Sequence, residues 1–291
     1  MRQRLTTHGV PSRAAGLLVV AAFAVLASAC GSTEPVLTDL MDARRLTGEL
    51  QAAFSRASEA SSRAVLADTD DVSAAAAKDA AASRAVVVER LASLDAVIAA
   101  LGYSAETGML STFKSRFEEY QKLDSEILEL AVENTNLKAQ RLTFGAQREM
   151  ADAINTELLQ GGGAAATDVD AQAVRADLFE LLFIEARHNA EADEAAMTQM
   201  EQRATAVAAD AQQRLARLAR VLTGPAVPAA ASLFERFMAT HDEAIALSRR
   251  NTNVRSLALT FGRARVVAAE CADAMQALQD SLATHGSEAT R

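Results

Sequence analysis

Hydrophobic residues recur at three- and four-residue steps along almost the whole chain, and no stretch alternates apolar and polar side chains as a strand does. Leu110, Phe113, Phe117 and Tyr120 follow this helical spacing. Alanine is abundant and aromatic side chains make up only 4% of the chain, a composition that favours helices packed closely together. The pattern therefore predicts an all-α protein.

Residues that end helices divide this pattern into eight expected helices. Asp68-Thr-Asp-Asp71 reads as an acidic turn, Gly102 as a helix cap, and Gly224-Pro225 as a break. In the first half the expected helices run from Leu37 to Leu66, onward to Leu101, from Thr107 towards Asn134, and from Leu137 to Leu159. In the second half they run over residues 168–190, 193–222, 228–250 and 253–285.

One long stretch of the chain occurs twice, at a constant offset of 117 residues and without a gap. Such a repeat predicts two copies of one helical unit. The matching residues include Phe117, Glu126, Leu130, Asn134, Thr135, Asn136, Thr143, Phe144, Gly145 and Arg148, which recur as Phe234, Glu243, Leu247, Asn251, Thr252, Asn253, Thr260, Phe261, Gly262 and Arg265.

The repeat and a run of glycines suggest where the units divide. Gly161-Gly-Gly163 does not continue a helix easily, so residues 161–166 are expected to be a linker. We expect two tandem, antiparallel, up-down-up-down four-helix bundles, over residues 37–160 and 167–287. Whether the bundles lie side by side or end to end stays open.

The repeated Asn-Thr-Asn triplet is the most distinctive polar feature. Asparagine tolerates the left-handed backbone conformation and its side chain bonds nearby backbone, which favours a tight turn. One unbroken helix of about 50 residues is the rival interpretation. If the triplets are turns, their functional interpretation is a polar ligand or partner site, and nearby arginines would recognise anions. The candidate residues are Asn134, Thr135, Asn136, Asn251, Thr252, Asn253, Arg148 and Arg265.

The N-terminus carries a processing signal. Residues 1–29 contain three arginines, no acid and an apolar run from Leu17 to Leu26 that is too short to span a bilayer well. The run ends in Ala-Ser-Ala-Cys30 and resembles a bacterial lipoprotein signal, which implies lipidation of Cys30. Residues 30–36 would be a tether. The resemblance to Gram-negative lipoproteins also implies, from Gly31 after the cysteine, a place at the outer membrane, facing the periplasm. A secretory signal cut near Ala29 and an uncleaved anchor are the alternatives.

Charge and cysteine content narrow the range of partners. The formal net charge is −9, and it becomes −12 once the three signal arginines are removed. An acidic surface argues against nucleic acid as a partner. With Cys30 lipidated, Cys271 is the only thiol left, and it falls on an apolar helix face as a small core residue.

No arrangement of residues indicates catalysis or a cofactor. Neither Gly-x-Ser-x-Gly nor a phosphate-binding loop occurs. His188, with Met197 and Met200 beyond it, leaves a haem or metal carrier as a minor alternative. His241 aligns with Asp124, and both are expected at the solvated surface. The sequence therefore favours a protein that is not an enzyme.

One pattern of residues runs from Phe117 to Leu158 and partly recurs in the second copy. Its members are Tyr120, Asp124, Ile127, Asn134, Ala139, Gly145 and Arg148, with Phe237, Ile245, Asn251, Gly262 and Arg265 in the second copy. Through these residues the segment resembles the second half of the four-helix-bundle ligand-binding domain of methyl-accepting chemotaxis receptors. The resemblance implies a sensor-like binding module that takes a small ligand or docks a chemoreceptor or sensor kinase, with a homodimer as one possibility. A structural envelope-interaction protein without a small ligand is the alternative. The family's second membrane span, linker and signalling hairpin have no counterpart here, and an asparagine stands where the family has a turn glycine.

Overall fold

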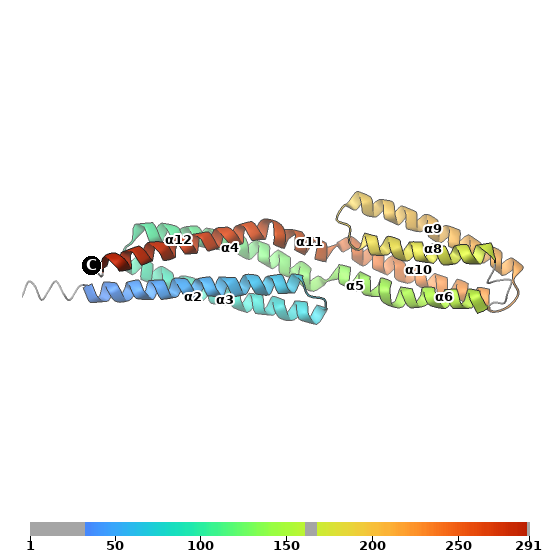
Figure 1. Ribbon diagram of the computed structural model, residues 1–291, viewed down its shortest axis with the longest axis horizontal. Coiled ribbons are helices and arrows are strands. Elements are labelled where there is room, and N and C mark those ends of the chain that lie inside the picture. The colour runs from blue at the N-terminus through green and yellow to red at the C-terminus, as the bar shows by residue number, and fades with distance from the viewer. Residues whose placement is uncertain (1–32, 161–167, 290–291) are drawn as a thin grey trace, which may run out of the picture. The chain divides into compact units, whose positions relative to one another are not determined.

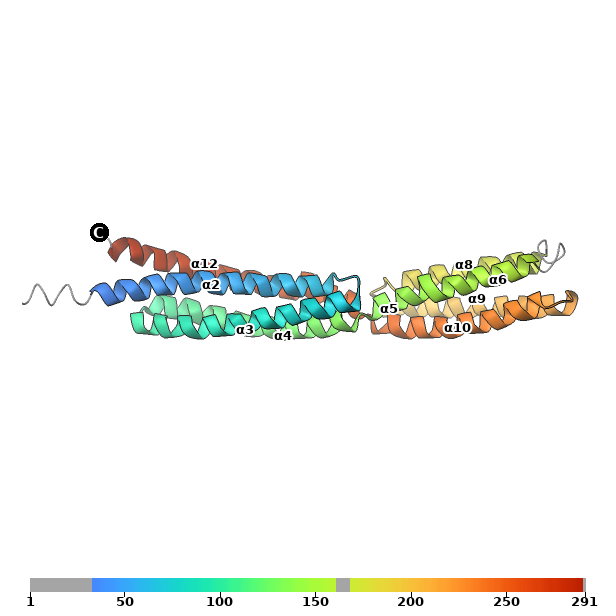
Figure 2. The ribbon, with the colours of Figure 1, turned by 90° about the horizontal axis from the view of Figure 1, so that it is seen from below.

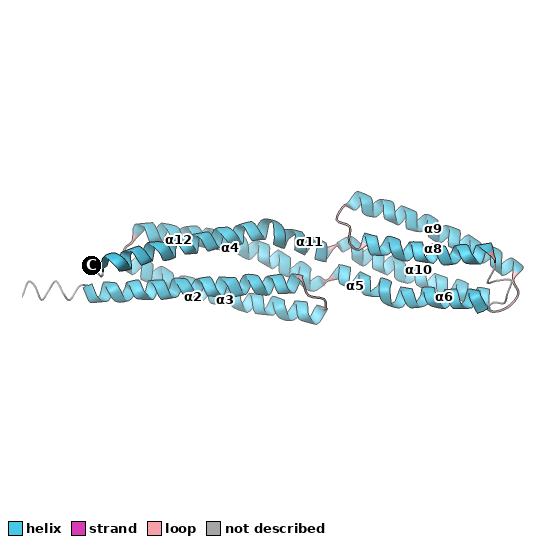
Figure 3. Cartoon of the chain, viewed as in Figure 1, coloured by secondary structure: helices cyan, strands magenta, loops and turns pink. Residues whose placement is uncertain are grey.

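The computed structural model describes residues 33–160 and 168–289, and within them every regular element is a helix (Figure 3). The prediction of an all-α helical-bundle fold is confirmed. The predicted signal at 1–29, the lipidation site Cys30 and the linker at 161–166 lie outside the described residues. Of the predicted tether at 30–36, residues 33–36 already belong to the first helix.

The helix boundaries agree with the sequence pattern to within a few residues. Gly102, which follows α3, has a φ of +69°, the left-handed conformation expected of a glycine cap. The first half of the chain forms α2 (Thr33–Val65), α3 (Asp70–Leu101), α4 (Ser104–Glu133), α5 (Thr135–Arg141), the π-helix η1 (Leu142–Gln147) and α6 (Arg148–Gln160). The second half forms α8 (Val169–His188), α9 (Glu194–Val221), α10 (Ala226–Arg250), α11 (Thr252–Leu259), the π-helix η2 (Thr260–Ala264) and α12 (Arg265–Ala289).

The chain forms two compact units, and unit 1 takes the described residues 33–54, 85–115 and 270–289. Four helix segments, from α2, α3, α4 and α12, contribute to it. Phe54 and Phe113 meet edge to face with their ring centroids 6.2 Å apart. Arg90 of α3 pairs with Glu49 of α2 at 3.0 Å. Cys271 of α12 is fully buried, as its position on an apolar face predicts.

Unit 2 takes the described residues 55–84, 116–160 and 168–269 and contains two hydrophobic clusters. One cluster joins the apolar faces of α6, α8, α9 and α10, with Ile154, Leu181 and Phe237 among its fully buried members. The other joins the end of α2, the start of α3, the second half of α4 and Ala264 of η2. Every one of these helices thus buries one apolar stripe, as the helical period predicts.

The predicted division into 37–160 and 167–287 is wrong. Ile154 and Leu158 of α6 pack with α8, α9 and α10, on the other side of the predicted linker, and unit 2 takes described residues from both sides of it. The physical reason is that the chain does not reverse after α4. Figures 1 and 2 show α5 leading onward from the end of α4, and α11 onward from the end of α10, instead of folding back as hairpins.

Candidate binding pocket in unit 2

The two Asn-Thr-Asn triplets lie against each other, in the two places where unit 2 passes from one long helix to the next. Asn134, between α4 and α5, and Asn251, between α10 and α11, each have a φ of 53°. They are the only residues other than glycine with positive φ in the described ranges. Each triplet is therefore a single left-handed residue between two helices, which is neither a tight reversing turn nor an unbroken helix.

Each triplet caps the helix that follows the other triplet. The backbone N–H groups of Thr135 and Asn136, at the start of α5, donate to Thr252 Oγ1 at 3.0 Å and Asn253 Oδ1 at 3.1 Å. In return, the N–H groups of Thr252 and Asn253 donate to Thr135 Oγ1 at 3.3 Å and Asn136 Oδ1 at 3.1 Å. These N–H groups have no partner within their own helix, so the repeats stabilise each other's helix starts.

The asparagine side chains complete this junction and leave it closed. Asn253 Nδ2 donates to Asn134 Oδ1 at 2.7 Å, and Asn136 Nδ2 donates to Asn251 Oδ1 at 2.9 Å. Thr135 and Thr252 are each only 1% exposed. The structure thus brings the six predicted triplet residues together, with five of them buried and Asn253 half-buried. Each makes a hydrogen bond across the junction, although Asn134 Nδ2 is buried without a partner among the described residues, so the triplets do not form an accessible ligand site. Arg148 and Arg265 lie elsewhere, each at the first position after a π-helix.

The two π-helices occupy equivalent positions in the repeat, and each lines a pocket. Single widened turns of this kind often mark functional sites in helical proteins. Phe144 of η1 and Phe261 of η2 correspond, and they are 55% and 56% exposed. A large apolar side chain that stays exposed at both copies is not explained by core packing.

The η1 pocket is a cavity of about 220 Å³ formed by η1, α6 and α8. Its size is below the ~300–1,000 Å³ typical of sites for drug-sized ligands, so it suits a metabolite-sized molecule. Phe179 and Phe183 are 67% and 62% exposed at its rim. Its apolar lining is Phe144, Ala151, Leu178, Phe179, Leu182, Phe183 and Ala186, and its polar lining is Thr143, Arg148, Asp152, Asn155 and Arg175.

The polar groups of the η1 pocket are unevenly paired. Arg148 lies 3.8 Å from Asp152, measured between Nε and Oδ2. Arg175 forms no ion pair with any residue the structure describes, and its buried Nε has no hydrogen-bond partner there. Asn155 Oδ1 is buried and unpartnered in the same way. A buried polar atom without a partner costs about 1–3 kcal/mol, so the pocket presents a donor and an acceptor that a ligand would satisfy.

A buried polar network stands directly behind this pocket. The Glu185 carboxylate accepts hydrogen bonds from Thr143 at 2.9 Å and from Gln147 at 2.7 Å, and it also contacts His241 Nδ1. Glu185 is 1% exposed and His241 is 6% exposed. The expectation that His241 and Asp124 are solvated is wrong, because the polar position they share in the repeat faces inward in both copies. Thr143 belongs to both the network and the pocket, and its hydrogen bond to Glu185 holds the wall of the pocket that η1 forms.

His188 belongs to a second buried network. Its Nδ1 lies 2.7 Å from Ser248 Oγ and its Nε2 lies 3.0 Å from Glu201 Oε1. Burial lowers the pKa of His188, and the hydrogen bond from Arg249 lowers the pKa of Glu201. The serine, histidine and carboxylate are connected as in a hydrolase triad, but Ser248 is 1% exposed, so a substrate does not reach its hydroxyl. Within the described residues, no group of three or more histidine, cysteine, aspartate or glutamate side chains is placed to hold a metal ion.

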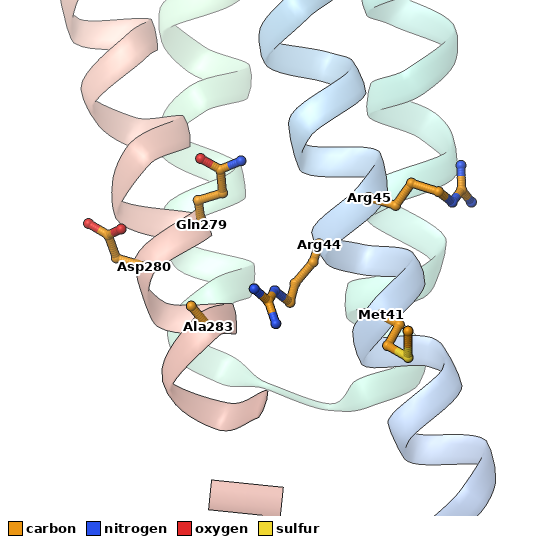
Figure 4. Close-up of a pocket in the computed structure, with 6 residues that line it drawn as sticks. All are labelled: Met41, Arg44, Arg45, Gln279, Asp280 and Ala283. Carbon is orange, nitrogen blue, oxygen red and sulfur yellow. The ribbon is translucent and has the colours of Figure 1, made fainter. Parts of the chain in front are cut away.

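A wider groove of about 510 Å³ lies in unit 1, between α2 and α12. Figure 4 shows Arg44 and Gln279 extending into the space between the two helices, whereas Arg45 points away from it. Arg45 is paired with Glu49 at 2.7 Å, and Met41 on the rim is 65% exposed. The groove offers little apolar wall to enclose a ligand, so the η1 pocket is the stronger candidate.

Sequence reasoning missed most of the η1 pocket. It identified Arg148 through the repeat, but not Arg175, Phe179 or Phe183. The signal was present in α8, where Leu178, Phe179, Leu181, Leu182, Phe183 and Ile184 form an apolar surface wider than one bundle seam needs.

Comparison with known proteins gives no match to any family model, curated protein or solved structure. None of the helices in the described ranges is long and apolar enough to cross a membrane.

Proposed function

We propose that the protein is a non-enzymatic, sensor-like binding module whose η1 pocket takes a small carboxylate with an aromatic body. The observation that carries this proposal is Arg175, a cation without a carboxylate partner in the described residues, beside three exposed phenylalanines. The rings offer flat apolar contact to an aromatic ligand, and the guanidinium matches a carboxylate in two parallel hydrogen bonds.

The wider setting of this proposal comes from the sequence. The lipoprotein-like signal supports a lipid anchor at Cys30 in the cell envelope, on the periplasmic side of the outer membrane. The likeness to chemoreceptor sensor domains supports a membrane receptor or sensor kinase as the partner that reads ligand binding. The buried network of Glu185 behind the η1 pocket supports the same role. Thr143 lines the pocket and donates a hydrogen bond to Glu185, so a ligand that contacts Thr143 acts on a member of that network.

The test is isothermal titration calorimetry with phenylacetate, and with phenylacetamide as its uncharged analogue. Phenylacetate is expected to bind, and phenylacetamide to bind at least about tenfold more weakly because Arg175 gains no charge-assisted bond from it. Arg175→Gln and Phe179→Ala should each weaken phenylacetate by about tenfold or more. Arg187→Gln is the matched control, because Arg187 is exposed on the same helix and does not line the pocket.

An affinity for phenylacetate that Arg175→Gln leaves unchanged would overturn the assignment of the pocket. The exposed phenylalanines also favour the alternative of an envelope-interaction protein that docks a protein there, a second copy of this chain included. Sedimentation of wild type and of Phe179→Ala separates the two functions. A self-association that the variant abolishes, together with no phenylacetate binding, would support the docking function instead.

A further inference from the structure

A second pocket, the η2 pocket, occupies the place in the repeat that corresponds to the η1 pocket. It has a volume of about 180 Å³. Thr260, Phe261 and Arg265 line it, and they stand 117 residues after Thr143, Phe144 and Arg148 of the η1 pocket. The duplication has therefore produced two cavities around the same structural device, a π-helix with an exposed phenylalanine and an arginine one turn further on.

The opposite walls of the two cavities differ in chemistry. In the η1 pocket that wall is α8, with two phenylalanines and two leucines. In the η2 pocket it comes from α2 and α4, which contribute Ser58, Ser61, Ser62, Tyr120 and Asp124. Ser61, Tyr120 and Asp124 are 4%, 3% and 1% exposed, so polar groups are buried where the other copy has apolar side chains at its rim.

Three hydroxyl groups of the η2 pocket already donate their protons within the protein. Ser62 donates to the Ser58 carbonyl at 3.0 Å, Thr260 donates to the Ser256 carbonyl at 2.7 Å, and Ser61 donates to the Asp124 carboxylate. A hydroxyl oxygen whose proton is committed still has lone pairs to accept with. The wall therefore presents acceptors, and it suits a ligand that brings hydrogen-bond donors of its own.

The charges of the η2 pocket determine which kind of hydrogen-bond donor a ligand should carry. Asp124 is paired with Arg84 at 2.7 Å, so the carboxylate is compensated and offers little to an ammonium group. Burial raises the pKa of Asp124, because the charged form of the carboxyl is disfavoured there, and this further weakens its attraction for a cation. Arg265 forms no ion pair with the described residues. The pocket therefore combines one available cation with neutral acceptors.

We propose that the η2 pocket binds a small hydroxylated carboxylate. Arg265 holds the carboxylate, the hydroxyl oxygens of Ser62 and Thr260 accept from the ligand's hydroxyl groups, and Phe261 covers its carbon skeleton. This site is independent of the η1 pocket, so the protein has two binding sites of different specificity on one duplicated framework.

The experiment compares L-lactate with L-alanine by calorimetry. The two molecules have nearly the same shape, and they differ in carrying a hydroxyl or an ammonium group. L-lactate is expected to bind at least about tenfold more tightly, because an ammonium ion loses its hydration there without gaining a compensating charge. Arg265→Gln and Ser62→Ala should each weaken L-lactate by about fivefold or more.

Arg148→Gln and Arg175→Gln are the matched controls from the other copy, and they should leave L-lactate binding unchanged. Arg265 is exposed, so its loss should leave the melting temperature unaltered, which circular dichroism checks. An affinity for L-alanine equal to that for L-lactate would overturn the inference. So would L-lactate binding that is lost with Arg175→Gln instead of Arg265→Gln, or no binding of L-lactate at all. Phenylacetate titrated into the same variants reports separately on the η1 pocket.

Discussion

Replacing Thr135 by valine tests whether the two triplets hold each other's helices. Valine keeps the shape of threonine but removes the hydroxyl group. That hydroxyl accepts from the N–H of Thr252 at 3.3 Å and lies 3.1 Å from the hydroxyl of Thr252. Both threonines are 1% exposed, so water does not replace the lost partner without opening the junction.

The size of the effect follows from these two contacts. A buried N–H left without an acceptor costs about 1–3 kcal/mol, so Thr135→Val is expected to lower the free energy of unfolding by that amount. Thr252→Val should act alike, because the contacts are reciprocal. The double variant loses the shared hydroxyl–hydroxyl bond only once, so its loss should fall short of the sum of the single losses by about 1 kcal/mol.

Urea unfolding followed by circular dichroism measures all of these values. The control is Thr156→Val, since Thr156 is exposed on α6 and its hydroxyl bonds only the Asp152 carbonyl of its own helix, at 2.8 Å. It should change stability by less than about 0.5 kcal/mol. A loss for Thr135→Val no larger than this control, or a double variant that is strictly additive, would refute reciprocal capping.

Two further predictions concern single buried residues. Asn134 has a φ of 53°, so Asn134→Gly should be less destabilising than Asn134→Ala by about 1 kcal/mol in the same urea assay. Equal losses of stability in the two variants would show that asparagine is not needed there for its left-handed backbone conformation. Burial lowers the pKa of His188, with Glu201 opposing and with Arg249 and His241 assisting. As the pH falls through about 6.5, His188 is therefore protonated in the unfolded chain but stays neutral in the folded protein. The free energy of unfolding then decreases as the pH drops below that value, by up to about 1.4 kcal/mol per pH unit. His188→Gln should flatten this slope below about pH 6.5, and an unchanged slope would contradict the assignment.

Much of the local structure could be predicted from the sequence, because it depends on residues close together in the chain. The three- and four-residue spacing of apolar side chains located the helices. Gly102 marked a helix end because a left-handed cap favours glycine. The duplication could also be detected from the sequence, since matching residues at a fixed offset are found without a structure.

The candidate site could be predicted only in part. The repeat pointed to Arg148 and Arg265, which line two pockets. It also pointed to the triplets, which pair with each other instead and have five of their six residues buried. Their capping partners lie 117 residues away, and no local pattern shows that two such segments meet.

The sequence by itself determined an all-α chain of two related halves, with asparagine where the backbone turns left-handed. Only the tertiary structure decided that these asparagines join helices without reversing the chain, so that α6 packs with α8, α9 and α10. One left-handed residue changes the direction of a helix locally, but whether the chain then returns or continues depends on which distant apolar faces are there to cover it. That choice belongs to the packing of the whole unit and not to any single segment.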